Sequence, residues 1–235
     1  MTQSEHSSKQ YDIDLETLRS RVLEMGGLVE SQILAAINGF MAGDLRALDA
    51  VVVDDHRVNA FEVGIDTDCS HLIARRQPAA GDLRMVLAVI KIVTDLERIG
   101  DEAAKIARMG KLSYSRALMP RTPVAAIKHV GDIAIGMLRK ALDPLARLDP
   151  VAAAAIVRED FAIDEEFRSI VRQLITFMME DPRTISQALE IVWIAKAIER
   201  IGDHSKNLAE QVIYIVKGAD VRHTSVEELE REALG

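Results

Sequence analysis

The chain carries the same five residues twice, and this repeat restricts its fold more than any other feature. Glu97-Arg98-Ile99-Gly100-Asp101 returns unchanged as Glu199-Arg200-Ile201-Gly202-Asp203, 102 residues later in a chain of 235. The spacing predicts a tandem duplication. In each copy two carboxylates lie four residues apart, on one face of a helix. Like charges at this spacing repel by roughly 0.2–0.5 kcal/mol, so keeping the pair twice indicates a function for it.

Apolar residues recur at helical spacing between clear breaks. Gly43-Asp44, Gln77-Pro78 and a loop over 113–121 separate the first four predicted helices, and proline disfavours helix in the residue before it. An N-cap followed by proline starts the fourth, fifth and sixth helices. The predicted helices cover about 12–41, 45–76, 79–112, 124–148, the segment starting at Asp149-Pro150, and the segment from Asp181-Pro182 to Lys217; the cap of the fourth is Thr122-Pro123, and Gly218 ends the sixth.

These elements predict an all-α fold of two tandem, similar three-helix bundles, six long antiparallel helices in all. The first bundle repeat spans 12–112 and the second spans 122–217, with tails at 1–11 and 218–235. We expect the first ten residues to be disordered. The acidic stretch from Glu227 to Glu232 is predicted to be a frayed helix or disordered.

Composition narrows the function classes. Aromatic residues make up 4% of the chain and aliphatic residues abound, which suits helices packed on helices. The net charge of −8 argues against nucleic-acid binding. Cys69 is the single cysteine, so no disulfide framework can form and a cytoplasmic location is expected. No apolar run approaches the roughly 20 residues that span a bilayer, so direct membrane insertion is not expected.

More polar side chains occur at the four-residue spacing. Asp160 and Asp164 form an Asp-x-x-x-Asp pair on the fifth predicted helix. Their counterparts on the second predicted helix are Asp55 and Asn59. Each half therefore places such a pair on the helix that precedes its Glu-x-x-x-Asp motif.

Distances along the chain predict which of these side chains meet. Asn59 lies 19 residues before Pro78 and Glu97 lies 19 residues after it. In an antiparallel hairpin both then sit about 28 Å from the turn. The same counting pairs Asp101 with Asp55, Glu199 with Asp164, and Asp203 with Asp160.

Clustered carboxylates must take up protons, pair with cations or bind metal. An all-oxygen set suits a hard cation such as Mg²⁺ or Mn²⁺, and also iron. The predicted ligands are Glu97, Asp101, Glu199, Asp203, Asp55, Asn59, Asp160 and Asp164. The alternative is that the carboxylates are solvated or pair with Arg98 and Arg200.

Other residues fit less sharply defined roles. The motif glycines permit either close approach of an ion or tight helix packing, at a cost of about 1 kcal/mol relative to alanine. His204 turns about 100° away from Asp203 on a helix, so we expect it at the surface or an interface. Trp193 is expected in the core or an interface. No Glu-x-x-His occurs in the chain, which argues against a ferritin-like oxidase.

The duplicated motif and its setting resemble the PhoU family of phosphate-specific transport system accessory proteins. The segment Gln77–Arg84, followed by Asp95–Asp101, is similar to the first repeat of that family, and Glu199–Asp203 is similar to the second. The likeness covers about residues 12–218. It implies a cytoplasmic negative regulator of phosphate uptake and the phosphate-starvation response, without catalytic residues.

The resemblance also implies partners and a metal. Family members are thought to link the ATPase subunit of a phosphate ABC transporter to a sensor histidine kinase, and some bind metal through the acidic motifs. We expect a homodimer and a bound divalent or trivalent ion, Mg, Mn or Fe. Asn59 departs from the acidic pattern, so the two halves are expected to differ in affinity. The alternatives are a carboxylate-ligated metal enzyme or metal-storage protein, and a purely structural helical module.

Overall fold

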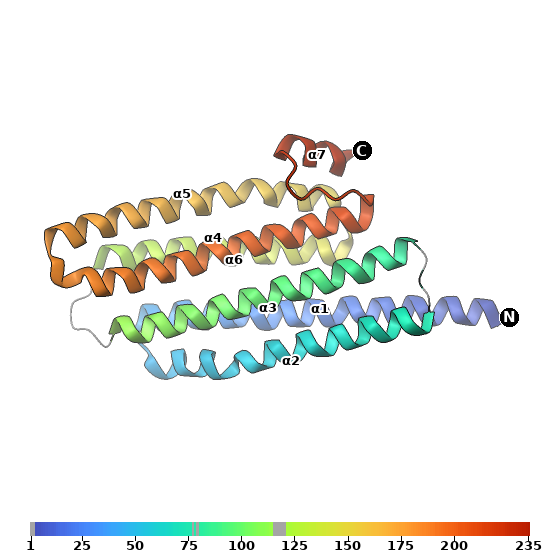
Figure 1. Ribbon diagram of the computed structural model, residues 1–235, viewed down its shortest axis with the longest axis horizontal. Coiled ribbons are helices and arrows are strands. Elements are labelled where there is room, and N and C mark those ends of the chain that lie inside the picture. The colour runs from blue at the N-terminus through green and yellow to red at the C-terminus, as the bar shows by residue number, and fades with distance from the viewer. Residues whose placement is uncertain (1–2, 77, 79, 115–120) are drawn as a thin grey trace.

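The computed structural model describes residues 3–76, 78, 80–114 and 121–235. Within these ranges the chain is almost entirely helical and contains no strand (Figure 1). The elements in chain order are α1 (Gln3–Ala42), α2 (Leu45–Arg76), α3 (Ala80–Tyr114), α4 (Arg121–Arg147), α5 (Pro150–Glu180), the 3-10 turn η1 (Pro182–Thr184), α6 (Ile185–Lys217) and α7 (Val226–Leu234).

Several predicted boundaries are confirmed, together with their causes. Gly43 adopts φ 66°, the left-handed conformation that ends α1. The Asp149 carboxylate accepts hydrogen bonds from the amides of Val151 and Ala152 at 3.1 and 3.0 Å, which caps α5 ahead of Pro150. Gly218 ends α6 with φ 78°. Caps and glycines therefore fix where these helices stop.

Three other boundaries differ from the prediction. The expected disordered lead is wrong, because α1 begins at Gln3 and no proline or glycine interrupts its first turns. Helix α4 begins at Arg121, so Thr122 lies inside the helix instead of capping it. Asp181 caps η1 by accepting from the Arg183 amide at 3.0 Å, and α6 starts later, at Ile185. Of the predicted loop, residues 113 and 114 belong to α3, and 115–120 lie outside the described ranges, as does Gln77.

The acidic C-terminal stretch forms a capped helix, so the helical alternative is confirmed, whereas the expectation of fraying or disorder is wrong. Ser225 and Glu228 form a reciprocal capping box at the start of α7. Leu229 is 1% exposed where α7 packs on α5. Arg158 of α5 also bonds Glu230, with Nη2 2.8 Å from Oε2. Apolar burial and an ion pair stabilise a helix that is too short to persist alone.

The long helices run side by side (Figure 1). Helices α2, α3, α6 and α5 follow one another across the molecule, with α1 and α4 behind them. Each half is the predicted antiparallel three-helix bundle. The two halves join chiefly through α3 and α6, and also through α1 and α4.

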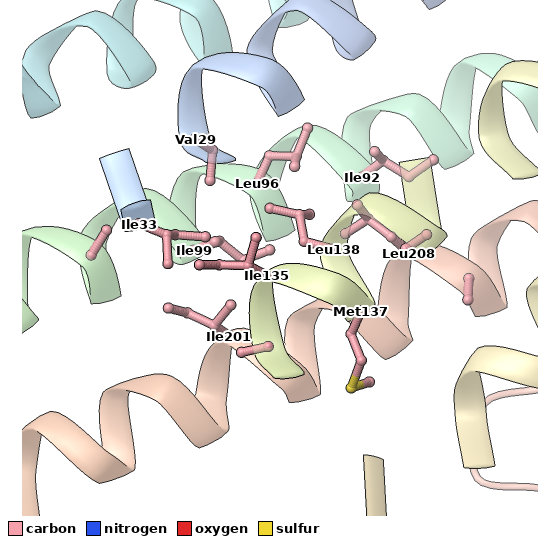
Figure 2. Packing of buried hydrophobic residues seen from close by; sticks show 14 of the residues in the cluster. Val29, Ile33, Ile92, Leu96, Ile99, Ile135, Met137, Leu138, Ile201 and Leu208 are labelled. Atoms are coloured by element: carbon pink, nitrogen blue, oxygen red, sulfur yellow. The ribbon is translucent and has the colours of Figure 1, made fainter. Parts of the chain in front are cut away.

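One apolar core runs through both halves. Figure 2 shows side chains from α1, α3, α4 and α6 converging at its centre; the fully or nearly fully buried members there include Ile33, Ile99, Ile135 and Ile201. Helices α3 and α6 cross this core in opposite directions. Lys91 lies over the ring of Tyr214 at 5.4 Å, and at the other end Gln187 Nε2 donates to the Ser113 carbonyl at 3.4 Å. The two acidic motifs therefore meet at the same level.

Candidate functional site

Each motif is anchored by its central isoleucine and glycine. Ile99 and Ile201 are fully buried. A methyl group on Gly100 would lie 3.1 Å from Val58 Cγ1 of α2, and one on Gly202 would lie 2.7 Å from Ile163 Cδ1 of α5. The packing interpretation of both glycines is therefore confirmed. Close packing holds α3 against α2, and α6 against α5, at the level of the carboxylates.

Valine in place of Gly202 is expected to lower the free energy of unfolding by about 1–3 kcal/mol, because it overpacks this contact. The control is Gly136→Val on α4, since nothing lies within 4 Å of a Cβ built at Gly136. That variant should stay within about 0.5 kcal/mol of the parent. Urea unfolding of both variants measures the difference. Equal losses at the two positions would contradict the packing interpretation.

Polar side chains beside the motifs connect the two halves. His204 Nδ1 lies 2.8 Å from Asp95 Oδ1, and Asn207 Nδ2 donates to the same oxygen at 3.2 Å. His204 is 6% exposed, so it lies at an interface and not at the surface. Arg200 Nη1 lies 2.6 Å from Glu102 Oε1. This arginine pairs across the junction and not with the motif carboxylates.

Trp193 was expected in the core or at an interface; it is 51% exposed, which rules out the core and agrees with the interface alternative. It lies on the α3–α6 junction, where Lys105 Nζ sits 5.5 Å from its ring centre. An aromatic ring can remain this exposed when a cation covers one of its faces.

In the first half the carboxylates of α2 and α3 act on one another. Burial raises the pKa of Asp55, and the charge of Asp101 raises it further. Burial also raises the pKa of Glu97, followed by the charges of Asp101, Glu62 and Asp55. The predicted meeting of Asp55 with Asp101 agrees with this coupling. Asn59 is exposed.

Sequence reasoning missed Glu62. Burial raises its pKa, and the charges of Asp66 and Asp101 add to the effect. Glu62 follows Asn59 by three residues, so helical spacing places it near the same face. That spacing was the available signal. We define the first-half cluster as Asp55, Glu62, Glu97 and Asp101.

The second-half cluster consists of Asp160, Asp164, Glu199 and Asp203. Burial raises the pKa of Asp203, and the charges of Asp160 and Asp164 raise it further. Burial likewise raises the pKa of Glu199, although a hydrogen bond from Lys196 opposes the change. Asp160 is buried, and Asp164 is half-buried with Arg168 3.9 Å away.

Two lysines distinguish the halves. Lys196 Nζ lies 2.6 Å from Glu199 Oε1, and Lys206 Nζ lies 2.7 Å from Asp160 Oδ2. The corresponding positions in the first repeat, 102 residues earlier, are Thr94 and Ala104. The second-half cluster therefore contains its own counter-charges, whereas the first-half cluster lacks them at these positions.

The fit to a metal ion differs between the halves for the same reason. Asp55 Oδ1 is buried and forms no complete hydrogen bond within the described part of the chain, although the neighbouring Gln32 side chain lowers the pKa of Asp55. An unpaired carboxylate oxygen among other carboxylates suits a hard cation. As the side chains stand, no three acidic, histidine or cysteine side chains of the described residues converge closely enough to hold a metal. The eight predicted ligands remain a prediction.

Comparison with known proteins gives a separate match for each half of the duplication. The family model for the PhoU domain matches residues 22–109 and again 127–212. The chain belongs to the PhoU family. It is 49% identical to a phosphate-specific transport system accessory protein PhoU homolog of a Burkholderia species, over 97% of this chain and 98% of that protein. It is 42% identical to the PhoU accessory protein of Escherichia coli K12, over 99% and 95% of the two chains.

Solved structures agree. The crystal structure of PhoU from Pseudomonas aeruginosa superposes with a TM-score of 0.85 at 42% identity, covering 89% of this chain and all of that one. A regulatory PhoU protein from Streptococcus pneumoniae gives 0.81 at 25% identity, covering 89% and 98%. The family resemblance and the all-α fold are thus confirmed. None of the helices in the described ranges combines the length and apolar character needed to cross a bilayer.

Proposed function

We propose that this chain is a cytoplasmic accessory regulator of a phosphate-specific transport system that restrains phosphate uptake and the phosphate-starvation response. The observation that carries the proposal is similarity along nearly the whole length to relatives bearing that name. It acts as an adaptor and not as an enzyme. Its partners are the ATPase subunit of the phosphate ABC transporter and the sensor histidine kinase of the same regulon, and it works as a homodimer.

The acidic clusters contribute a bound cation to this function. The predicted ligands are contributed by neighbouring helices, so an ion would link α2 to α3, or α5 to α6. A ligand that binds only the folded state stabilises it by mass action. The first-half cluster is the tighter site in this proposal, because Lys196 and Lys206 compete with a cation in the second half. Asn59 lowers the charge of the first half by one but can still ligate through its amide oxygen.

Deleting the gene tests the regulatory role. In the source bacterium grown at high phosphate, we expect alkaline phosphatase activity to rise about tenfold or more, which corresponds to about 1.4 kcal/mol in an equilibrium between signalling states. Restoring the gene should return the activity to its low level. Activity that stays low after deletion would refute negative regulation by this chain.

A further inference from the structure

A cavity of about 740 Å³ lies over the C-terminal half of α6, and its lining includes Asp160 and Asp164 of the second-half cluster. Helix α3 forms one wall and α5 the other. Residues from the segment between α6 and α7, together with α7 itself, close one end. Cavities of this size hold small molecules such as cofactors.

Four basic side chains from three segments line the cavity: Lys91 and Arg98 of α3, Lys206 of α6, and Arg222 ahead of α7. Lys206 is bonded to Asp160, and Arg222 to Asp220. Lys91 and Arg98 form no ion pair with any carboxylate of the described residues. Lys91 lies over the Tyr214 ring, and the charge of Arg98 lowers the pKa of Glu62 and Glu97, but neither cation is bonded to a carboxylate of the described residues, so both can contact an anion.

Four carboxylates line the cavity, namely Asp95, Asp160, Asp164 and Glu210, and each has a partner or a raised pKa; Asp164 lies 3.9 Å from Arg168. Asp160 accepts from Lys206, and Asp95 accepts from Asn207 beside His204. Burial raises the pKa of Glu210 to about 7, so near neutral pH much of it carries a proton and can donate a hydrogen bond. These groups repel an anion less than their number suggests.

Two further groups indicate what the rest of a ligand looks like. Gln211 is 4% exposed, and its Oε1 is buried without a hydrogen-bond partner in the described part of the chain. A buried acceptor of this kind needs a donor. Phe161 lines the opposite wall and is 62% exposed, which leaves a ring available for stacking.

We propose that this cavity binds a nucleotide, with phosphoryl oxygens on Lys91 and Arg98 and the base against Phe161. An exocyclic amino group of the base supplies the donor that Gln211 lacks. Arginine and lysine bind phosphate oxygens by charge-assisted hydrogen bonds, and aromatic rings stack on bases.

The cavity depends on the C-terminal segment, which the first half does not have. Residues 222–229 supply Arg222 and the end wall, and they follow the second repeat only. The family match ends at residue 212, ahead of this segment. The proposed site thus combines the repeat with an added element.

Calorimetric titration of the full chain with ATP, AMP and inorganic phosphate tests the proposal. We expect the nucleotides to bind at micromolar to low millimolar concentration. Lys91→Met should weaken nucleotide binding about tenfold or more. Phe161→Ala should weaken the nucleotides and leave inorganic phosphate unchanged, which separates base stacking from phosphate binding.

The matched control is Lys128→Met, which removes one lysine from α4, where it pairs with Asp132. It should bind as the parent does, and circular dichroism confirms that all variants fold. Binding of inorganic phosphate alone, lost in Lys91→Met, would support an anion site but overturn the nucleotide. The proposed site would be overturned if none of the three probes bound at low millimolar concentration, or if Lys91→Met left their affinities unchanged.

Discussion

Glutamine in place of Glu210 is expected to raise the free energy of unfolding by about 3 kcal/mol at pH 8. The folded protein holds this carboxyl with a pKa of about 7 against 4.5 for the free side chain, mainly because of burial, while Lys206 and Arg222 oppose the increase. A pKa difference of one between the folded and unfolded states corresponds to about 1.4 kcal/mol. The folded state binds the extra proton, so stability falls as pH rises from 4.5 to 7 and is level above.

The increase in the free energy of unfolding of Glu210→Gln should therefore be small near pH 4.5, grow between pH 4.5 and 7, and stay constant above pH 7. Urea unfolding at pH 5, 6, 7 and 8 measures it. Glu180→Gln is the control, because Glu180 is exposed at the end of α5 and its change should stay within about 0.5 kcal/mol. A gain that does not depend on pH would show that the charge of Glu210 is not its cause.

Neutralising Asp55 and Asp101 together is expected to weaken Mn²⁺ binding at the first-half cluster about 100-fold. Affinity for hard cations depends on the number of charged oxygens, and the charge of Asp101 raises the pKa of Asp55 after burial does, so these two side chains act on one another. Asparagine keeps the size of each side chain and removes its charge. Electron paramagnetic resonance, which follows free Mn²⁺ directly, measures the affinity of Asp55→Asn with Asp101→Asn.

The second half provides the comparison. Asp160→Asn with Asp203→Asn should leave the tight site intact, because the proposal assigns that site to the first half. Lys206→Met should instead strengthen the weaker site, since it removes the ammonium bonded to Asp160. Equal losses from the two aspartate pairs would contradict the proposed difference between halves. Unchanged Mn²⁺ affinity in both would remove metal binding from the proposed function.

The helical spacing of apolar residues and the helix caps allowed the fold to be predicted from the sequence. Asp149 caps α5, and Gly218 ends α6, because each acts through its own backbone or its nearest neighbours. Counting residues from Pro78 also predicted that Asp55 lies near Asp101, because residues at equal distances from the turn lie side by side in straight antiparallel helices. Local signals of this kind do not depend on which helices pack together.

What the sequence could not reveal depends on contacts between distant segments. The acidic stretch after Ser225 is held in place because Leu229 packs against α5. The residues of the stretch do not indicate which helix Leu229 contacts. The burial of His204 likewise needs Asp95 on another helix. Lys206 lies three residues from Asp203, so its contact with Asp160 was accessible to the same counting that paired the acids. The cavity could not be predicted either, because its lining comes from α3, α5, α6 and the C-terminal segment together.

The antiparallel contact of α3 with α6 joins equivalent helices of the two repeats, as would happen if one repeat paired with its own copy about a symmetry axis. In such an ancestral dimer every substitution would appear twice. After fusion each copy can change alone. Positions 102 and 204 correspond, yet one holds glutamate and the other a histidine that bonds Asp95, whose own counterpart is Ala197. The acidic clusters differ in the same way, since Lys196 and Lys206 of the second half correspond to Thr94 and Ala104 of the first.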